Sequence, residues 1–151
     1  LSTIHTNSAI GAIARLRDMG IESYLLASSL RVVIAQRLVR RLCEDCKTPV
    51  KPSATIQKEF QLEKNENIYQ AVGCANCNNT GFKGRIALAE CINISDKLKA
   101  LIHDEASEAK LAESAFKENL SLDLSSSQLL RDGLTSYEEL LRVQNHQDAN
   151  L

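Results

Sequence analysis

The chain has 151 residues, enough for one ordinary domain or two small ones, and 44% of them are apolar, so a packed core is possible. Only 4% are aromatic and Trp is absent, so the core must be aliphatic, which favours helix because Leu and Ala are strong helix formers. A net charge of −1 offers no global attraction to nucleic acid or anionic membrane, and no run of eighteen apolar residues exists to span a bilayer.

Charge is distributed unevenly along the chain. Residues 1–42 hold six arginines and two acidic residues, residues 43–94 are balanced, and residues 95–151 hold eleven acidic residues against six basic ones. We interpret these as three segments with a basic start and an acidic helical end, although plain solvated charge is an equal alternative. No signal peptide is visible, and the absence of an initial Met predicts that the chain is a fragment.

The first segment is predicted to be mostly helical. Residues 1–5 are expected to end a strand, and Ser8 to cap a helix over about residues 9–19. A second helical pattern begins at about residue 22 and continues to residue 33. Residues 36–42 mix apolar residues with arginines and predict either the end of this helix or a short strand.

The middle segment is irregular and then becomes a strand. Residues 43–84 hold both prolines, with one helical turn predicted over residues 57–62. Apolar residues then alternate over residues 85–94, which predicts a strand, and Glu90 interrupts the alternation.

The last segment is predicted to be a set of short helices. One begins at Ser95, and a second surrounds Leu111. Residues 125–127, three consecutive serines, predict a loop or a cap. The final helix is expected to begin at Thr135 with a capping box, and residues 145–151 are expected to fray.

Two Cys-x-x-Cys pairs carry the chemistry of the sequence. The first pair is Cys43 and Cys46, the second is Cys74 and Cys77, and 27 residues lie between them. Zinc in structural sites takes four soft ligands at tetrahedral corners, and two intervening residues let one tight turn aim both thiolates at the same point. The pairs therefore predict a closed, structural zinc site, with an excursion in residues 47–73 because the spacing exceeds that of ordinary zinc ribbons.

Two other interpretations of the pairs are a redox dithiol and two disulfides. A redox Cys-x-x-Cys usually occurs singly beside a βαβ pattern, and disulfides need an oxidising compartment that nothing here indicates. The fifth cysteine, Cys91, lies inside the predicted strand and is interpreted as a buried apolar thiol.

Four blocks of sequence resemble the ATPases of type II secretion and type IV pilus assembly. The opening LSTIHTN (1–7) looks like their histidine box, and AQRLVRRLC (35–43) is similar to the stretch that leads into their zinc site. The block GCANCNNTGFKGR (73–85) resembles the second half of that site, and TSYEELLRV (135–143) their C-terminal helix. The four cysteines favour the secretion and pilus-extension branches, because the retraction branch lacks them.

The resemblance implies a fold and an activity. The fold is α/β to mainly α: residues 1–42 would be the rear part of a RecA-like ATPase core, 43–94 a tetracysteine zinc module with its strand, and 95–151 a C-terminal helical bundle. The full protein would be a homohexamer that hydrolyses ATP with Mg²⁺ to assemble a pilus or pseudopilus and export protein. It would be cytoplasmic and peripheral at the inner membrane, with partners in an inner-membrane platform and among cytoplasmic secretion or pilus-assembly proteins.

The resemblance also assigns residues. His5 would sense or contact the γ-phosphate of ATP; without the resemblance, it is a solvated bystander. Thr6 and Asn7 have hydrogen-bonding side chains that would couple nucleotide state to the next helix, or they are simply N-capping residues. The charged run ahead of the zinc site is a candidate intersubunit nucleotide contact, because guanidinium stabilises phosphoryl charge, or simply a solvated charge run. That run supplies three residues: Arg37, Arg40 and Arg41. No G-x-x-x-x-G-K-[ST] motif occurs, so the chain is predicted to be inactive alone.

One stretch departs from the family pattern. Residues 122–127 read LDLSSS where the family commonly has a Met-Arg-x-Asp-Gly stretch, which hints at a specialised branch such as mannose-sensitive-haemagglutinin pili. The insert between the cysteine pairs offers apolar anchors for docking a membrane-platform protein, unless they pack inward. These anchors are Ile56, Phe60, Leu62, Ile68 and Tyr69. The rival function is a zinc-ribbon module that binds nucleic acid or protein, but residues 43–94 are charge-neutral and poor in aromatics, so no nucleic-acid partner is expected.

Overall fold

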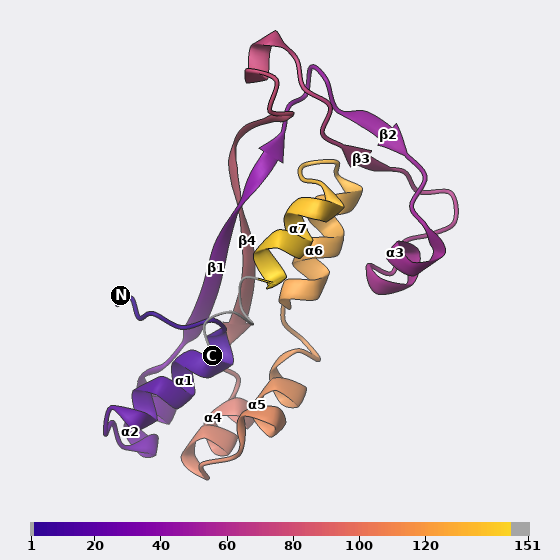
Figure 1. Cartoon of the computed structure of the whole chain (residues 1–151). Helices are drawn as coiled ribbons and strands as arrows, with labels where there is room; N and C mark the ends of the chain where they lie inside the picture. Colours follow the sequence, from indigo (N-terminus) through magenta and orange to yellow (C-terminus); the bar gives the residue numbers. More distant parts are fainter. Residues whose placement is uncertain (1, 146–151) are drawn as a thin grey trace. The chain divides into compact units, whose positions relative to one another are not determined.

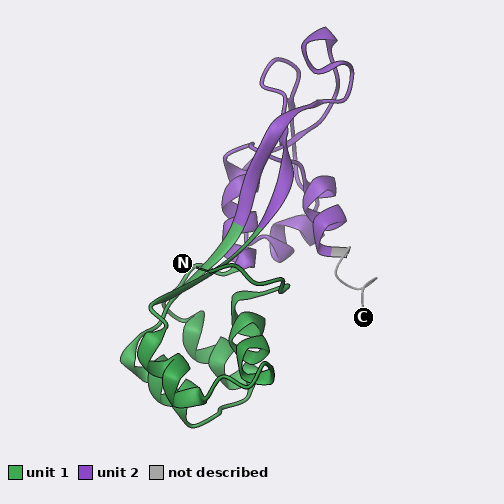
Figure 2. Cartoon of the chain, turned by 90° about the vertical axis from the view of Figure 1, so that its left-hand side faces the viewer, with its two compact units in different colours: residues 1–36, 89–121 green, residues 37–88, 122–151 purple. Residues whose placement is uncertain are grey.

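The computed structural model describes residues 2–145 as a mixed α/β chain with seven α-helices and two small two-stranded sheets in that part of the sequence (Figure 1). Its residues separate into two compact units, shown in Figure 2. Unit 1 comprises residues 1–36 and 89–121, and unit 2 comprises residues 37–88 and 122–151. Each unit combines parts of the three predicted segments, 1–42, 43–94 and 95–151. The assignment of these segments as domains remains a prediction.

Unit 1 is built from four helices around an aliphatic core. The helices are α1 (Ala9–Asp18), α2 (Ser23–Ser29), α4 (Asp96–His103) and α5 (Glu108–Ala115). Each presents small or branched apolar side chains to the interior, and the strand residue Ile92 joins them. The most deeply buried members of this core are Ala9, Ile13, Ile92, Ile102, Leu111 and Ala115. The prediction of an aliphatic core is confirmed in this unit.

The start of α1 is set by hydrogen bonds that the sequence predicts. Ser8 is the N-cap, and its Oγ accepts a hydrogen bond of 2.9 Å from the backbone N–H of Gly11. The helix ends at Asp18, and Gly20 follows with a φ of +84°. The prediction of a helix over about residues 9–19 is therefore confirmed. By contrast, residues 2–6 form no strand, because no described strand pairs with them.

The second helix is shorter than predicted. Helix α2 ends at Ser29, Leu30 is already extended, and strand β1 (Val32–Leu42) follows at once. The expected continuation to Val33 was wrong because the run Val32, Val33 and Ile34 is β-branched, and such side chains favour the pleated backbone. The open choice for residues 36–42 is settled as strand. Strand β1 pairs with β4 (Phe82–Asn93), which confirms the predicted strand over 85–94 and extends it.

Unit 2 contains the insert between the cysteine pairs and the two last helices. Strands β2 (Thr48–Val50) and β3 (Ile68–Gln70) pair antiparallel, and α3 (Ala54–Glu59) lies between them in sequence. Helices α6 (Leu122–Arg131) and α7 (Tyr137–Asn145) complete the unit. Its main core cluster uses all parts of the unit: Val39, Phe60, Leu62, Ile68, Leu88, Leu129, Leu130 and Leu140.

The insert packs inward on this core. Phe60, Leu62 and Ile68 are buried, and the Phe60 ring meets the Tyr137 ring edge to face at 5.7 Å. Of the five predicted anchors, only Ile56 and Tyr69 keep partial exposure. Three of the five apolar side chains therefore stabilise unit 2 and are not free to contact a partner.

The three serines at 125–127 correct another prediction. They lie inside α6 and are buried, whereas the sequence pattern predicted a loop or a cap. The flanking residues Leu122, Leu129 and Leu130 recur at helical spacing and pack on the core of unit 2, so packing overrides the weak helix propensity of serine.

None of the helices among residues 2–145 combines the length and the apolar composition that a membrane span requires.

Candidate functional site

The four paired cysteines converge at one end of unit 2. Cys43 directly follows β1, and a turn in which the N–H groups of Cys46 and Lys47 donate to the Cys43 carbonyl carries the first pair. In the second pair, Cys74 is the N-cap of the short 3₁₀ helix η1 (Ala75–Cys77) and Cys77 is its last residue. The two turns are joined because the Cys43 N–H donates to the carbonyl of Gly81 at 3.0 Å.

The sulfur positions match a metal site. The Sγ atoms of Cys43 and Cys74 are 3.9 Å apart, those of Cys46 and Cys77 are 3.8 Å apart, and all four lie within 4.8 Å of one another. A Zn–S distance of about 2.3 Å places tetrahedral sulfurs about 3.8 Å apart, and these two separations agree with that value. All four are free thiols, and the group is half-buried.

The backbone supplies donors to these sulfurs. The N–H of Gly73 donates to Cys46 Sγ at 3.3 Å, and the N–H groups of Cys74 and Gly81 each donate to Cys77 Sγ at 3.2 Å. Such donors stabilise a thiolate, and outer hydrogen bonds of this kind orient metal ligands.

Two glycines permit this arrangement. Gly73 has a φ of +115°, and a Cβ there would lie 2.8 Å from the carbonyl oxygen of Asn79. Gly81 has a φ of +76°, and a Cβ there would lie 2.6 Å from the Cβ of Ala71. Both values of φ lie in the left-handed region, which favours glycine. A Cβ atom at either position would also collide with neighbouring residues. These residues therefore bring the second cysteine turn close enough to the neighbouring backbone to complete the site.

The pKa values of two thiols in the cluster are shifted in opposite directions. Burial would raise the pKa of Cys77, but the N–H groups of Cys74 and Gly81 outweigh it and lower the pKa to about 6. For Cys43, the N–H of Asp45 favours the thiolate, yet burial and the neighbouring thiols prevail and raise the pKa to about 12. One thiolate forms readily and the next is opposed by its neighbours, so a divalent cation is the group that would let all four ionise.

The predicted histidine box, residues 5–7, lies in unit 1, directly ahead of α1. His5 and Asn7 are exposed and Thr6 is partly buried. Thr6 Oγ1 donates to the carbonyl of Ser8 at 3.2 Å, which ties the segment to the helix start. The cysteines lie in the other unit, so the two predicted sites belong to separate compact parts of the chain.

The three candidate arginines differ in their surroundings along β1. Burial alternates along the strand as far as Val39, but Arg40 and Arg41 are both exposed and Leu42 is buried, so alternation is interrupted at these two arginines. Arg37 is partly buried. Arg41 Nη2 forms an exposed ion pair with Glu44 at 3.2 Å. Arg40 is held more firmly: its guanidinium lies 4.1 Å over the ring of Phe82 and pairs with Glu139 at 2.7 Å.

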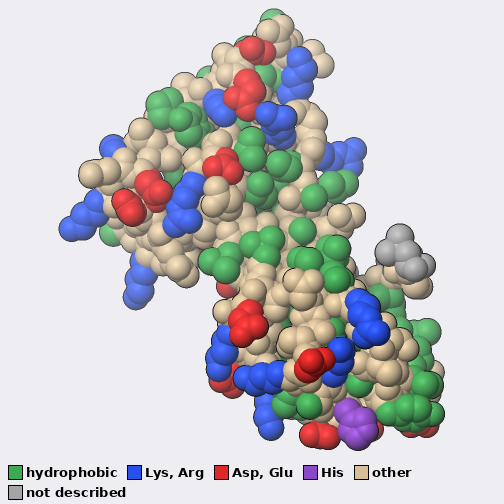
Figure 3. Space-filling model, turned by 180° about the vertical axis from the view of Figure 1, so that it is seen from behind, with side chains coloured by type: hydrophobic (Ala, Val, Ile, Leu, Met, Phe, Trp, Pro, Cys, Tyr) green, Lys and Arg blue, Asp and Glu red, His purple; other side chains and the backbone are tan. Residues whose placement is uncertain are grey.

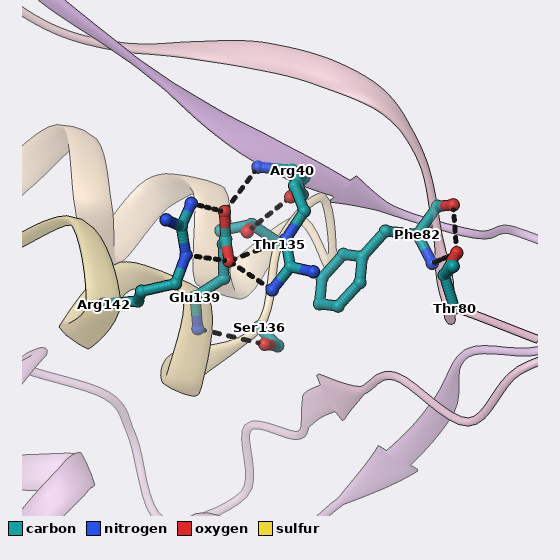
Figure 4. A network of polar contacts seen from close by, with 7 residues as sticks. All are labelled: Arg40, Thr80, Phe82, Thr135, Ser136, Glu139 and Arg142. Carbon is teal, nitrogen blue, oxygen red and sulfur yellow. Dashed lines mark hydrogen bonds and ion pairs between the residues drawn. The ribbon is translucent and has the colours of Figure 1, made fainter.

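Glu139 forms the centre of a buried polar network, drawn in Figure 4. Its side chain is fully buried, and its carboxylate lies between the guanidiniums of Arg40 and Arg142. Arg40 donates from its backbone N–H, Nε and Nη2 at 2.7–2.9 Å, and Arg142 donates from Nε and Nη2 at 2.7–2.9 Å. In the same network, Thr135 Oγ1 donates to the Arg40 carbonyl at 2.8 Å.

Burial would raise the pKa of Glu139, but the hydrogen bonds from Arg142 and Arg40 outweigh it and lower the pKa to about 2. Sequence reasoning missed this residue because it placed the capping box at Thr135. The N-cap of α7 is instead Ser136, whose Oγ accepts from the Glu139 N–H at 3.3 Å. Reading Ser136-x-x-Glu139 as the box would have singled out Glu139.

Comparison with known proteins places the chain in a family. The family model described as "Type II/IV secretion system protein" matches residues 1–142. The chain belongs to this family. It is 44% identical over 145 residues to the type II secretion system ATPase E of Vibrio cholerae, covering 95% of this chain and 29% of that protein.

Other relatives in the family agree. The chain is 43% identical over 145 residues to the putative type II secretion system protein E of Escherichia coli, again covering 95% of the chain and 29% of the relative. It is 41% identical over 147 residues to the type IV pilus assembly ATPase PilB of Myxococcus xanthus, covering 93% of the chain and 26% of that protein. The chain thus spans under a third of the length of these relatives.

Proposed function

We propose that this chain is the C-terminal part of an ATP-driven motor that assembles a pilus or pseudopilus and exports protein, with one structural zinc in unit 2. The observation that carries the proposal is a cluster of four thiols within 4.8 Å of one another, inside a chain whose family match covers residues 1–142. The proposal includes a RecA-like core, of which residues 1–42 are the rear part, and a C-terminal helical bundle. The full protein would act as a homohexamer with ATP and Mg²⁺ at the cytoplasmic face of the inner membrane.

Cys43, Cys46, Cys74 and Cys77 would hold the zinc. A closed four-thiolate site leaves no coordination position for water or substrate, so the metal would supply cross-linking and no chemistry. It would join the end of β1 to the turn before β4 and close the insert of residues 47–73 into a loop with fixed ends.

The histidine box is proposed to contact the γ-phosphate through His5, with Thr6 and Asn7 linking nucleotide state to α1. An exposed imidazole at the start of a capped helix is accessible to a ligand. Among the arginines, Arg41 is the better candidate for an intersubunit nucleotide contact, because its exposed ion pair with Glu44 is worth little. Arg40 would have to give up buried Glu139, and Arg37 stays in the proposal as a partly buried residue of the same strand.

Docking to an inner-membrane platform protein would use the polar surface of the insert, since three of its five apolar anchors are buried. Charge reversal at the exposed residues Lys51, Lys58 and Lys64 is the test. The proposal expects impaired secretion or piliation with normal ATP turnover and zinc content. Normal secretion and piliation in these variants would mean that the zinc module only stabilises the fold and does not dock a partner.

The rival function is a zinc-ribbon module for nucleic acid. On the face shown in Figure 3, basic and acidic side chains are interspersed and neither sign forms a continuous patch. Affinity for nucleic acid depends on neutralising many phosphates, so this surface disfavours the rival. Salt-sensitive binding of this chain to single-stranded DNA would favour it.

Two assays test the motor proposal. In the full-length ATPase, His5→Ala should reduce ATP turnover by a factor of at least ten, while His103→Ala, at an exposed histidine of the same unit, should not. The 151-residue chain alone should release no phosphate from ATP, because it has no phosphate-binding loop motif. Turnover that co-purifies with the isolated chain would contradict the assignment of its role.

A further inference from the structure

Glu90 is a buried carboxylate in the middle of an apolar strand. It lies in β4, is 4% exposed, and interrupts the alternation of apolar residues that predicts the strand. Its Oε1 accepts a hydrogen bond from the backbone N–H of Ala9, which is fully buried and is the first residue of α1. A carboxylate removed from water is costly unless it is hydrogen-bonded, and the N–H groups and positive dipole end of a helix start provide that partner.

The same helix start carries the histidine box. Thr6 Oγ1 donates to the carbonyl of Ser8, and Ser8 Oγ accepts from the N–H of Gly11. The backbone from Thr6 to Gly11 is therefore hydrogen-bonded together, and Ala9 within it is anchored to Glu90. Only three residues separate His5 from Ala9.

We propose that Glu90 is a positioning residue for the histidine box. It fixes the first turn of α1 to β4, and this turn determines where His5, Thr6 and Asn7 leave the fold. Glu90 touches no nucleotide and acts through Ala9. The inference rests on the proposed function, in which His5 contacts the γ-phosphate, and it deepens that function by naming what holds the contact in place.

The charge of Glu90 matters to this role. A hydrogen bond to an ionised acceptor is about twice as strong as a neutral one, so the carboxylate holds Ala9 more tightly than an amide oxygen does. Glu90→Gln keeps the size of the side chain and an acceptor oxygen but loses the charge. Glu90→Asp keeps the charge but is one methylene too short to reach the same N–H. Both variants should therefore loosen the helix start without opening a large cavity.

The kinetic test uses the full-length ATPase. Misplacement of a reacting group by about 1 Å can cost roughly a hundredfold in rate, so Glu90→Gln should lower kcat by a factor between about 10 and 100 with little change in the KM for ATP. The matched control is Glu105→Gln, in the same unit, whose carboxylate accepts from Ser23 Oγ at the start of α2 at 3.2 Å. This control should leave kcat unchanged.

A double-mutant cycle separates positioning from a general structural role. If Glu90 acts through His5, then Glu90→Gln should cause no further loss of kcat once His5 is replaced by Ala. Losses that multiply in the double variant, or a wild-type kcat in Glu90→Gln, would overturn the inference.

A measurement on the 151-residue chain keeps the two proposals distinguishable. Hydrogen exchange at the Ala9 amide should be at least tenfold faster in Glu90→Gln, while exchange at the Gly11 amide, which Ser8 protects, should change less. An unchanged Ala9 amide would overturn the inference even if the full-length enzyme is active. If the wild-type full-length protein hydrolyses no ATP, the proposed function fails, whatever the Ala9 amide shows.

Discussion

The two compact units stabilise themselves in different ways. Unit 1 packs four helices around eleven buried apolar residues and buries one carboxylate, Glu90, at a helix start. Among the residues that the structure describes, unit 2 has a main core cluster of eight buried apolar residues, two three-residue strands and a long insert, and it adds a thiol cluster and the Glu139 network. Where the chain is irregular, thiol and polar contacts therefore add to apolar burial.

The largest expected effect tests this contrast through the metal. Cys43→Ser should abolish zinc binding and unfold unit 2 selectively, because the binding free energy of structural zinc is folding free energy, on the order of 10 kcal/mol. Elemental analysis should give one zinc per wild-type chain, and hydrogen exchange should show lost protection in β2, β3 and α7 but retained protection in α1 and α4. Cys91→Ser, outside the cluster, is the control.

Two results would contradict the prediction for Cys43→Ser and the zinc site. Purified protein with no metal, or with the four thiols in disulfides, would remove the zinc site. Equal loss of protection in both units would show that the units do not differ in the way proposed here.

The next effect concerns Glu139. Replacing it by Gln leaves the guanidiniums of Arg40 and Arg142 without their carboxylate. Removing one partner of a buried pair costs about 3–5 kcal/mol, but both arginine side chains are 47% exposed and recover water, so we expect about 2–3 kcal/mol. Urea unfolding of the zinc-loaded chain measures this. Glu138→Gln, at the exposed neighbouring position, should change stability by less than about 0.5 kcal/mol.

The pH dependence of stability follows from the same residue. The pKa of Glu139 is lowered from 4.5 to about 2 in the folded chain, so its contribution is complete above pH 4.5 and is lost as the pH falls from about 4.5 to about 2. Acid also protonates the thiolates and releases metal, so the informative quantity is the difference between wild type and Glu139→Gln. That difference in unfolding free energy should shrink as the pH is lowered through this window. A difference that stays constant would contradict the ionised pair.

The sequence predicted local features better than the pairing of distant ones. Ser8 at a helix start, the alternating strand before residue 94 and the Cys-x-x-Cys turns are visible within a few residues, because caps, alternation and ligand spacing are local rules. The contacts of Glu90 with Ala9 and of Glu139 with Arg40 join residues 81 and 99 positions apart. Glu90 is an interruption of the apolar alternation and Glu139 is one charged residue of a helix, since no local pattern says that a distant N–H or guanidinium will meet either carboxylate.

The smallest expected effect concerns Ser126 in unit 2. Its side chain is fully buried in α6, and Oγ has no hydrogen-bond partner in the described part of the chain. A buried hydroxyl without a partner costs about 1–3 kcal/mol, although serine hydroxyls recover part of this by local bonding. Alanine has no polar group to bury and a helix propensity better by about 0.5 kcal/mol.

Ser126→Ala should therefore stabilise unit 2 by about 0.5–1.5 kcal/mol and raise the urea midpoint of the zinc-loaded chain with an unchanged slope. The same change cannot help unit 1, so amides of α1 and α4 should exchange at the wild-type rate. A loss of stability would mean that the Ser126 hydroxyl is hydrogen-bonded in solution. Unit 2 would then hold one more buried polar contact of the kind that Glu139 provides, and it would differ more from unit 1 in this respect.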